Sequence, residues 1–184
     1  MSFDGRSLSH TLPAYSFRER LIILFSMNAM PLLTRLFLSH RINTVVWRLL
    51  GCRVGRGSVI RMGTQINAPT RVVIGRNCSI HGHLKSRGGI AIGDSVELVE
   101  EVMISTQSHN TDSPHFESVY VPVFIDDYSW LGPRCIVLPG VTLAKGTVVA
   151  AGAVVTKDTE EWRVYAGVPA RMLKQRAVLE WAAT

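Results

Sequence analysis

Cysteine and charge are both scarce in this sequence, and each shortage excludes a class of protein. The 184 residues include three cysteines, which lie far apart, and no CxxC or Cys/His spacing indicates a zinc site. An odd and sparse count also argues against a disulfide framework and favours a reducing, cytoplasmic setting. The first ten residues, MSFDGRSLSH, lack the charged and apolar regions of a secretory signal. Charged residues make up 18% of the chain and apolar residues 47%, which suits one domain with a sizeable core.

A nucleic-acid partner is not expected, although the chain has a net charge of +6. Most of this excess lies in residues 1–53, which hold seven arginines and two acidic residues. The remaining body is close to neutral and has neither a nucleic-acid-binding motif nor a basic stripe interleaved with aromatic residues. A basic, apolar N-terminal segment indicates contact with some other anionic surface.

Residues 15–50 are predicted to be helical, because they lack glycine and carry arginines spaced among leucines. Pro31 is expected to end or kink a first helix. The apolar run does not form a membrane span, since Asn28, Pro31 and Arg35 interrupt it. Two interpretations remain. The helices pack on the body or on a neighbouring subunit, or one of them lies in a membrane interface with its arginines at the head groups.

From residue 54 the chain divides into hexads, of which "IGDSVE LVEEVM" is an example. The first position of every hexad is aliphatic except at Ser86, and the fifth is mostly small or aliphatic. A period of six is typical of a parallel β-helix, in which three hexads form one triangular coil and the first residue points inward. Small or polar residues occupy the corners, and stacked coils satisfy each other's backbone groups. The coils predicted in this way are 54–71, 74–91, 92–109, 125–142 and 143–160.

The stretch IDDYSWLGPRCIVLPGVTLAKGTVVAAGAVVTKD, followed by YAGVPARML, resembles the hexapeptide-repeat acyltransferases. Within that group, residues 51–175 are similar to sugar O-acetyltransferases of bacterial exopolysaccharide (colanic-acid type) and nodulation-factor synthesis. The resemblance implies a mainly β fold, a left-handed parallel β-helix of about five coils. It also implies acetyl-CoA as cosubstrate, a homotrimer with active sites between subunits, and a carbohydrate acceptor. The expected units are a helical segment at 1–53, the β-helix at 54–168 and a short C-terminal helix at 169–184, beginning near Pro169.

The hexad rhythm is lost at 110–124, inside the stretch ISTQSHNTDSPHF, and resumes at Ile125. A loop that leaves a rigid scaffold often carries function. In the resembled family the catalytic histidine lies just before such an excursion, which is the place of His109. A histidine titrates near neutral pH, so it can take the proton of a sugar hydroxyl as that oxygen attacks a thioester. No serine or cysteine lies in a recognisable nucleophile motif, so direct transfer is expected rather than an acyl-enzyme.

Three further residues are weaker candidates for binding the acceptor: His83, Asp112 and His115. His83 lies roughly where galactoside-type enzymes carry an acceptor-binding asparagine, and the other two lie in the excursion. His81 and His83, two residues apart on one predicted strand, would face the same way. With His109 they would form a three-histidine metal site like that of γ-type carbonic anhydrases. That alternative is retained as a rival, but no metal is expected, because it leaves the CoA signature without a role.

The same resemblance predicts where acetyl-CoA binds. Small residues leave room for the pantetheine arm, and basic residues suit its phosphates. The expected cofactor-binding residues are Trp130, Gly132, Ala151, Gly152, Thr156, Lys157, Arg171 and Lys174. Pro133 departs from the family pattern, because related enzymes often carry a serine there, and it removes a backbone donor.

These observations favour an acetyl-CoA-dependent O-acetyltransferase that acts on a sugar or a cell-surface polysaccharide precursor. The expected location is the cytoplasm, at the inner face of the membrane if the N-terminal helices bind lipid. Rival hypotheses are an N-acetyltransferase for an amino sugar or amino acid, the metal-dependent hydratase, and a β-helix without catalysis.

Overall fold

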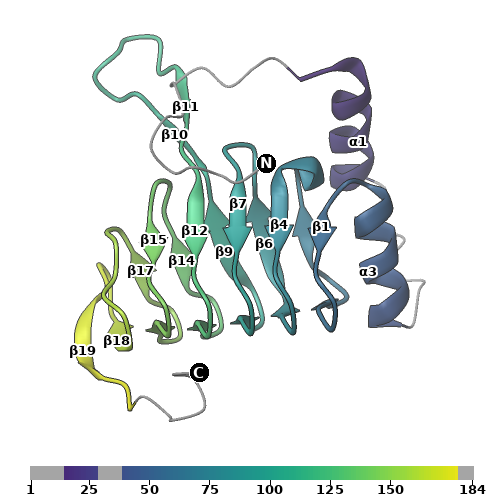
Figure 1. The fold of residues 1–184 in the computed structure, drawn as a ribbon. Helices are drawn as coiled ribbons and strands as arrows, with labels where there is room; N and C mark the ends of the chain where they lie inside the picture. Colours follow the sequence, from purple (N-terminus) through teal and green to yellow (C-terminus); the bar gives the residue numbers. More distant parts are fainter. Residues whose placement is uncertain (1–14, 29–38, 178–184) are drawn as a thin grey trace.

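The computed structural model describes residues 15–28 and 39–177, which form a triangular β-helix with two helices at its N-terminal end (Figure 1). Three parallel sheets make the sides of the column. The first sheet contains β1 (Arg53–Val54), β4 (Val72–Ile74), β7 (Ile90–Ile92), β12 (Val123–Ile125) and β15 (Thr142–Leu143). The second contains β2 (Val59–Ile60), β5 (Ser79–Ile80), β8 (Glu97–Leu98), β13 (Trp130–Leu131), β16 (Val148–Val149), β18 (Arg163–Ala166) and β19 (Arg171–Gln175). The third contains β3 (Gln65–Ile66), β6 (Gly82–Lys85), β9 (Val102–Ser105), β14 (Ile136–Val137) and β17 (Val154–Val155).

The core is a stack of inward aliphatic side chains, as the hexad pattern predicts. Each coil places its inward residue over the inward residue of the preceding coil. Ile92 pairs with Ile74 in this way, and Val149 pairs with Leu131. The first-position aliphatics from Ile60 to Val155 are all at most 4% exposed. Their burial removes a continuous column of apolar surface from water, at about 25 cal/mol per Å². The column has five complete coils, and β18 begins a sixth, so the structure is slightly longer than predicted.

The predicted register is wrong at Ser86, and the error explains the missing aliphatic residue. Leu84 takes the inward place in the third sheet, where it pairs with Ile66 below and Ile104 above. Ser86 is fully buried at the next corner, where its hydroxyl donates to the Ala68 carbonyl at 3.0 Å and accepts from the Ala68 N–H at 3.1 Å. The second coil thus shortens one side by two residues and lengthens the following corner by the same amount.

Small residues at the fifth hexad position fill the corners, as predicted, and bond the backbone of the next coil. The Ser58 hydroxyl donates to the Gly75 carbonyl at 2.6 Å and accepts from the Cys78 N–H at 2.9 Å. Cys78 and Cys135 are themselves buried corner residues, and burial raises the pKa of the Cys135 thiol to about 12. A thiol in that state is a packing group rather than a nucleophile.

The helix α3 (His40–Leu49) closes the N-terminal end of the column. Trp47 is fully buried in the core. The Asn43 amide donates to the carbonyls of Ile60 and Arg61, both at 2.9 Å, and the Ile60 N–H donates to the Thr44 hydroxyl at 2.9 Å. These side chains supply partners for backbone groups that would otherwise stand at an open sheet edge.

The helix α1 (Phe17–Asn28) packs on β3 and on the short 3₁₀ turn η1 (Pro69–Arg71). It begins with a capping box, in which Ser16 and Glu19 exchange backbone and side-chain hydrogen bonds. The bonds from Ser16 lower the pKa of the Glu19 carboxyl. The predicted break at Pro31 lies outside the described residues. Within 15–28 and 39–177, neither helix has the length and apolar composition that a membrane span needs.

The prediction of a C-terminal helix from Pro169 is wrong. Residues after Gly167 turn back, and β19 pairs antiparallel with β18. The reason is the free edge of the second sheet, since β18 is the last parallel strand and leaves backbone groups without a neighbour. Pairing with that edge gives its backbone groups partners, whereas a short helix exposed to solvent is only marginally stable. Residues 178–184, the rest of the predicted helix, are not described.

We expect Asn43→Ala to destabilise the protein by about 1–3 kcal/mol, because the buried Ile60 carbonyl and the half-buried Arg61 carbonyl lose their donor. Urea unfolding at fixed protein concentration measures the effect. Arg41→Ala is the matched control, because Arg41 lies on the same helix and is exposed. Equal unfolding midpoints for the two variants would show that α3 does not cap the column through Asn43.

Candidate functional site

The break in the hexad rhythm forms a β-hairpin that projects from the column (Figure 1). Its strands are β10 (Gln107–His109) and β11 (Ser118–Tyr120), which pair antiparallel with Ser108 opposite Val119. The excursion is therefore present as predicted, but it begins at Gln107 rather than after His109. A short hairpin lets the chain leave the stack while most of its backbone groups keep partners.

His109 is exposed on the first strand of this hairpin. Its Nδ1 lies 2.6 Å from the backbone carbonyl of Phe116 across the hairpin. A carbonyl oxygen can only accept, so we assign the proton to Nδ1, which leaves Nε2 of the neutral ring with a free lone pair. The hydrogen bond both selects this tautomer and fixes the orientation of the ring.

Asp112 and His115 lie at the exposed tip of the hairpin. The Asp112 N–H donates to the Asn110 side chain at 3.1 Å, and the His115 N–H donates to the Ser113 hydroxyl at 3.3 Å. Both contacts are typical of turns. The ring of His109 is oriented by the Phe116 carbonyl, and the acceptor-binding roles of Asp112 and His115 stay predictions.

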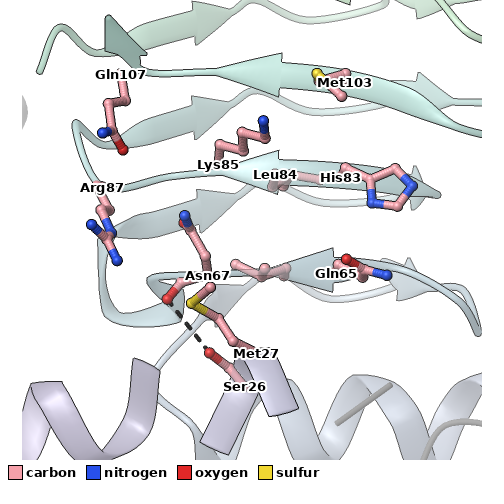
Figure 2. Close-up of a pocket in the computed structure, with 11 residues that line it drawn as sticks. Ser26, Met27, Gln65, Asn67, His83, Leu84, Lys85, Arg87, Met103 and Gln107 are labelled. Atoms are coloured by element: carbon pink, nitrogen blue, oxygen red, sulfur yellow. Dashed lines mark hydrogen bonds between the residues drawn. The ribbon is translucent and has the colours of Figure 1, made fainter. Parts of the chain in front are cut away.

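A pocket of about 420 Å³ lies between α1 and the outer face of the third sheet (Figure 2). His83, a predicted acceptor residue, is half-buried in its wall, and Gln107 at the base of the hairpin lines it too. His109 does not line it. The pocket walls are formed by Ser26, Met27, Gln65, Ile66, Asn67, His83, Leu84, Lys85, Arg87, Met103 and Gln107.

The expected pairing of His81 with His83 is wrong. His81 lies at the corner between β5 and β6, whereas His83 lies on β6, so the two do not share a strand. His81 Nδ1 lies 3.9 Å from a Glu100 carboxylate oxygen, and burial lowers the pKa of its ring. No three His, Cys, Asp or Glu side chains in the described part of the chain are arranged to hold a metal ion.

One group of predicted CoA residues lies on β13 and at the turns from the second to the third sheet. Trp130 is half-buried, and Gly132 beneath it is buried. A Cβ at Gly132 would lie 2.8 Å from the Ala151 nitrogen. Glycine is therefore required at this position by the close contact between coils, and not by an open groove for a ligand. Ala151 and Gly152 are exposed, and Gly152 has a positive φ of 67° with open space above it.

A second group lies at the C-terminal end of the column. Lys157 and Arg171 both line a hollow of about 280 Å³, together with Asp158 and Tyr165. Thr156 is exposed beside Lys157. Lys174 pairs through its backbone with Val164 on β18 and does not line this hollow. The structure therefore brings Lys157, predicted to line the groove, together with Arg171, predicted to hold phosphates, and leaves Lys174, the other predicted phosphate residue, outside this hollow.

Sequence reasoning missed Lys85 and Arg87, which lie in the same pocket as His83. Alternation along a strand was the available signal, because Lys85 is two residues after His83 and faces the same side. The contribution of α1 through Ser26 and Met27 carried no comparable signal.

Comparisons with known proteins bear on this arrangement. A family model described as "Bacterial transferase hexapeptide (six repeats)" matches residues 122–157. WcaF of Escherichia coli (strain K12), named as a colanic acid biosynthesis acetyltransferase, is 31% identical over 143 residues, which are 77% of this chain and 79% of that protein. The galactoside O-acetyltransferase of the same strain is 28% identical over 127 residues, 66% of this chain and 63% of its own.

Solved structures show the same fold. A hexapeptide-repeat acetyltransferase from Vibrio cholerae O1 biovar eltor, in complex with acetyl coenzyme A, matches with a TM-score of 0.80 and 24% identity. The match covers 91% of this chain and 94% of that one. The hexapeptide repeat is present, and WcaF is 31% identical over more than three quarters of both chains. This chain therefore belongs to the hexapeptide-repeat acetyltransferase family.

Proposed function

We propose that the protein transfers an acetyl group from acetyl-CoA to a hydroxyl group of a sugar, with His109 as the general base. The observation that carries this proposal is the likeness to WcaF, which extends well beyond the repeat region matched by the family model. The galactoside O-acetyltransferase, whose printed name states a sugar acceptor and an O-acetyl product, supports the same acceptor class.

The tautomer of His109 suits this chemistry. Nε2 accepts the proton of the sugar hydroxyl while the hydroxyl oxygen attacks the thioester carbon. The imidazolium is stabilised by its hydrogen bond from Nδ1 to the Phe116 carbonyl. When the tetrahedral intermediate collapses, the C–S bond breaks, and Nε2–H returns the proton to the leaving thiolate. The ester and free CoA are the products, and no covalent intermediate on the protein is needed.

Acetyl-CoA is expected to run along the column towards its C-terminal end. Lys157 and Arg171 share one hollow and supply two positive charges for its phosphates. Ala151, Gly152 and Thr156 present little bulk beside the extended arm. Trp130 on the wall and Lys174 at the margin complete the proposed cofactor site, whereas Gly132 is buried and permits the close contact between coils beneath it.

A homotrimer is proposed because one chain separates the parts that the reaction must combine. His109 lies on the projecting hairpin, whereas His83 lies in the pocket beneath α1, and His109 does not line that pocket. A neighbouring subunit that received the hairpin against its own column would bring a base and an acceptor pocket together.

The two N-terminal helices are proposed to contact an anionic membrane surface. On α1, Phe17, Leu21 and Leu24 are between 51% and 78% exposed, and on α3 Val45 and Leu49 are 50% and 79% exposed. Four exposed arginines stand on the same helices, at Arg18, Arg20, Arg41 and Arg48. Apolar side chains beside arginines are the composition of a helix that binds in the head-group region.

We expect His109→Ala to lower turnover by about 10²–10⁴-fold, the usual loss for a general base, with little change in CoA affinity. His109→Asn should be similarly slow, because its amide can still donate to the Phe116 carbonyl but cannot take a proton. Ser108→Ala, on the same exposed strand, is the control. Thiol release from acetyl-CoA and CoA titration measure the two quantities, and near-normal turnover in His109→Asn would remove His109 from the mechanism.

Light scattering during size-exclusion chromatography should give three times the mass of one chain. A neighbouring subunit is expected to complete the site because His109 does not line the pocket of its own chain, and the resembled family assembles as trimers. Assay of the same eluted fraction links assembly to activity. A monomeric fraction with full activity would refute the shared site.

Vesicle sedimentation tests the membrane contact without removing α3, whose Asn43 and Trp47 close the column. The protein should co-sediment with anionic vesicles at low salt and dissociate as salt rises, because each arginine near the surface contributes about 1 kcal/mol. Leu21→Gln combined with Leu24→Gln should weaken binding. Leu173→Gln, an exposed apolar residue on β19, is the control. Equal sedimentation of both variants with the wild type would exclude α1 as the lipid-binding element.

A further inference from the structure

The pocket between α1 and the third sheet has a strong charge bias. Lys85 and Arg87 line it beside the imidazole of His83, and none of its described lining side chains carries a carboxylate. Figure 2 shows Arg87 at the side of the pocket near Gln107, Lys85 near the middle, and His83 at the opposite side. The pocket therefore offers two cationic side chains, at one side and in the middle, and an imidazole at the other side.

The cations have no ionic partner in the described part of the chain. The ion pairs found there are Arg76–Asp94, His81–Glu100, Arg134–Glu101 and Arg163–Glu160, and none involves the pocket. The Nε atom of Arg87 is shielded from solvent and lacks a hydrogen-bond partner among the described residues. A shielded guanidinium N–H without an acceptor is costly, so it favours a ligand that brings an anionic oxygen.

The position of Arg87 is fixed by its backbone rather than by its side chain. Its carbonyl accepts from the Arg71 guanidinium at 2.7 Å and from the Tyr15 hydroxyl at 3.4 Å. The Arg71 guanidinium also lies 4.2 Å from the centre of the Tyr15 ring. The corner that carries Arg87 is therefore anchored, and its guanidinium is not needed to hold the fold together.

Beside these groups the pocket presents neutral amides, which suit sugar hydroxyls. Asn67 lies near the middle, and its Oδ1 accepts from the Ser86 N–H at 2.7 Å, which leaves its amide N–H groups as donors. Gln65 and Gln107 line the wall on either side. Amides that can donate and accept are the usual partners of vicinal hydroxyls.

The pocket also adjoins the apolar surface of α1. Met27 lines the pocket and is 52% exposed, so its side chain belongs both to the wall and to the outer face of the helix. Leu24, one turn earlier on α1, is 59% exposed. Exposed apolar side chains of α1 therefore adjoin the pocket at Met27.

We propose that this pocket recognises an activated sugar, one that carries a phosphate or diphosphate at its anomeric carbon. Lys85 and Arg87 bind the phosphate oxygens, and Gln65, Asn67 and Gln107 bind the sugar hydroxyls. The proposal rests on the proposed acetyl transfer to sugars and narrows its acceptor class. A nucleotide-linked and a lipid-linked sugar share this chemistry, and the continuity with the apolar face of α1 favours the lipid-linked form.

Steady-state acetyl transfer should be compared for a free hexose, its 1-phosphate, the UDP-linked hexose and a short polyprenyl-diphosphate-linked hexose. The phosphorylated acceptors should have a kcat/KM at least tenfold above that of the free hexose. Lys85→Gln and Arg87→Gln should each lower this kcat/KM by about tenfold to a hundredfold, the usual loss of a charged hydrogen bond, and change that of the free hexose less than threefold. Lys85→Arg should retain the preference, and Arg56→Gln, an exposed arginine elsewhere on the column, should change neither.

Calorimetric titration of the hexose 1-phosphate into the CoA-loaded protein tests the phosphate-binding pocket separately from the proposed acetyl transfer. If acetyl transfer is absent for all acceptors but the 1-phosphate binds and Lys85→Gln abolishes binding, the proposed function fails and the anion site stands. If transfer occurs but neither variant alters affinity or kcat/KM for phosphorylated acceptors, the inference is wrong. Preference for the UDP-linked over the polyprenyl-linked sugar would assign the site to nucleotides, and the reverse would assign it to lipid carriers. Matching thermal transitions establish that the variants are folded.

Discussion

Stacking of one coil on the next is the constraint on which the rest of this molecule depends. Each coil pairs its backbone with the coils on either side, as Ile125 does with Ile92 and Leu143. The two ends of such a stack have no neighbour, and the chain supplies one at each. Asn43 and Thr44 of α3 bond the first coil, whereas β19 folds back on β18 at the other end. A column in which almost every inward position is committed to packing leaves function to outward side chains and excursions.

The candidate site follows from that division. Leu84 must point inward because it stacks on Ile66, so its neighbours His83 and Lys85 must point outward. They therefore lie on a rigid face and need no support of their own. The hairpin has the opposite character, because it leaves the stack and is held by its own cross-strand bonds. His109 is oriented there by the Phe116 carbonyl, a bond that forms only when the two hairpin strands pair.

Local pattern predicted the parts that local chemistry decides. The hexads identified the fold and the buried aliphatics, and the loss of register identified the excursion beside His109. The errors fall where distant residues decide the outcome. Leu84 rather than Ser86 turns inward because of its neighbours in the coils below and above, and the Pro169 segment becomes a strand because β18 presents a free edge. The pocket could not be predicted, since it needs α1 to lie against residues about forty positions later, as in the contact of Ser26 with Asn67.

The position of α1 places an exposed apolar helix face beside the polar pocket, two features that lie far apart in the sequence. One face of the helix packs on the column through Ile23 and Ser26, and the other leaves Leu21 and Leu24 exposed. Between these faces, Met27 borders the pocket. A helix placed in this way brings an apolar, arginine-bearing surface next to a polar pocket that contains two cationic side chains. An acceptor with a lipid tail, a phosphate and a sugar combines these three chemistries, so the membrane contact and the acceptor site proposed above would depend on the same helix.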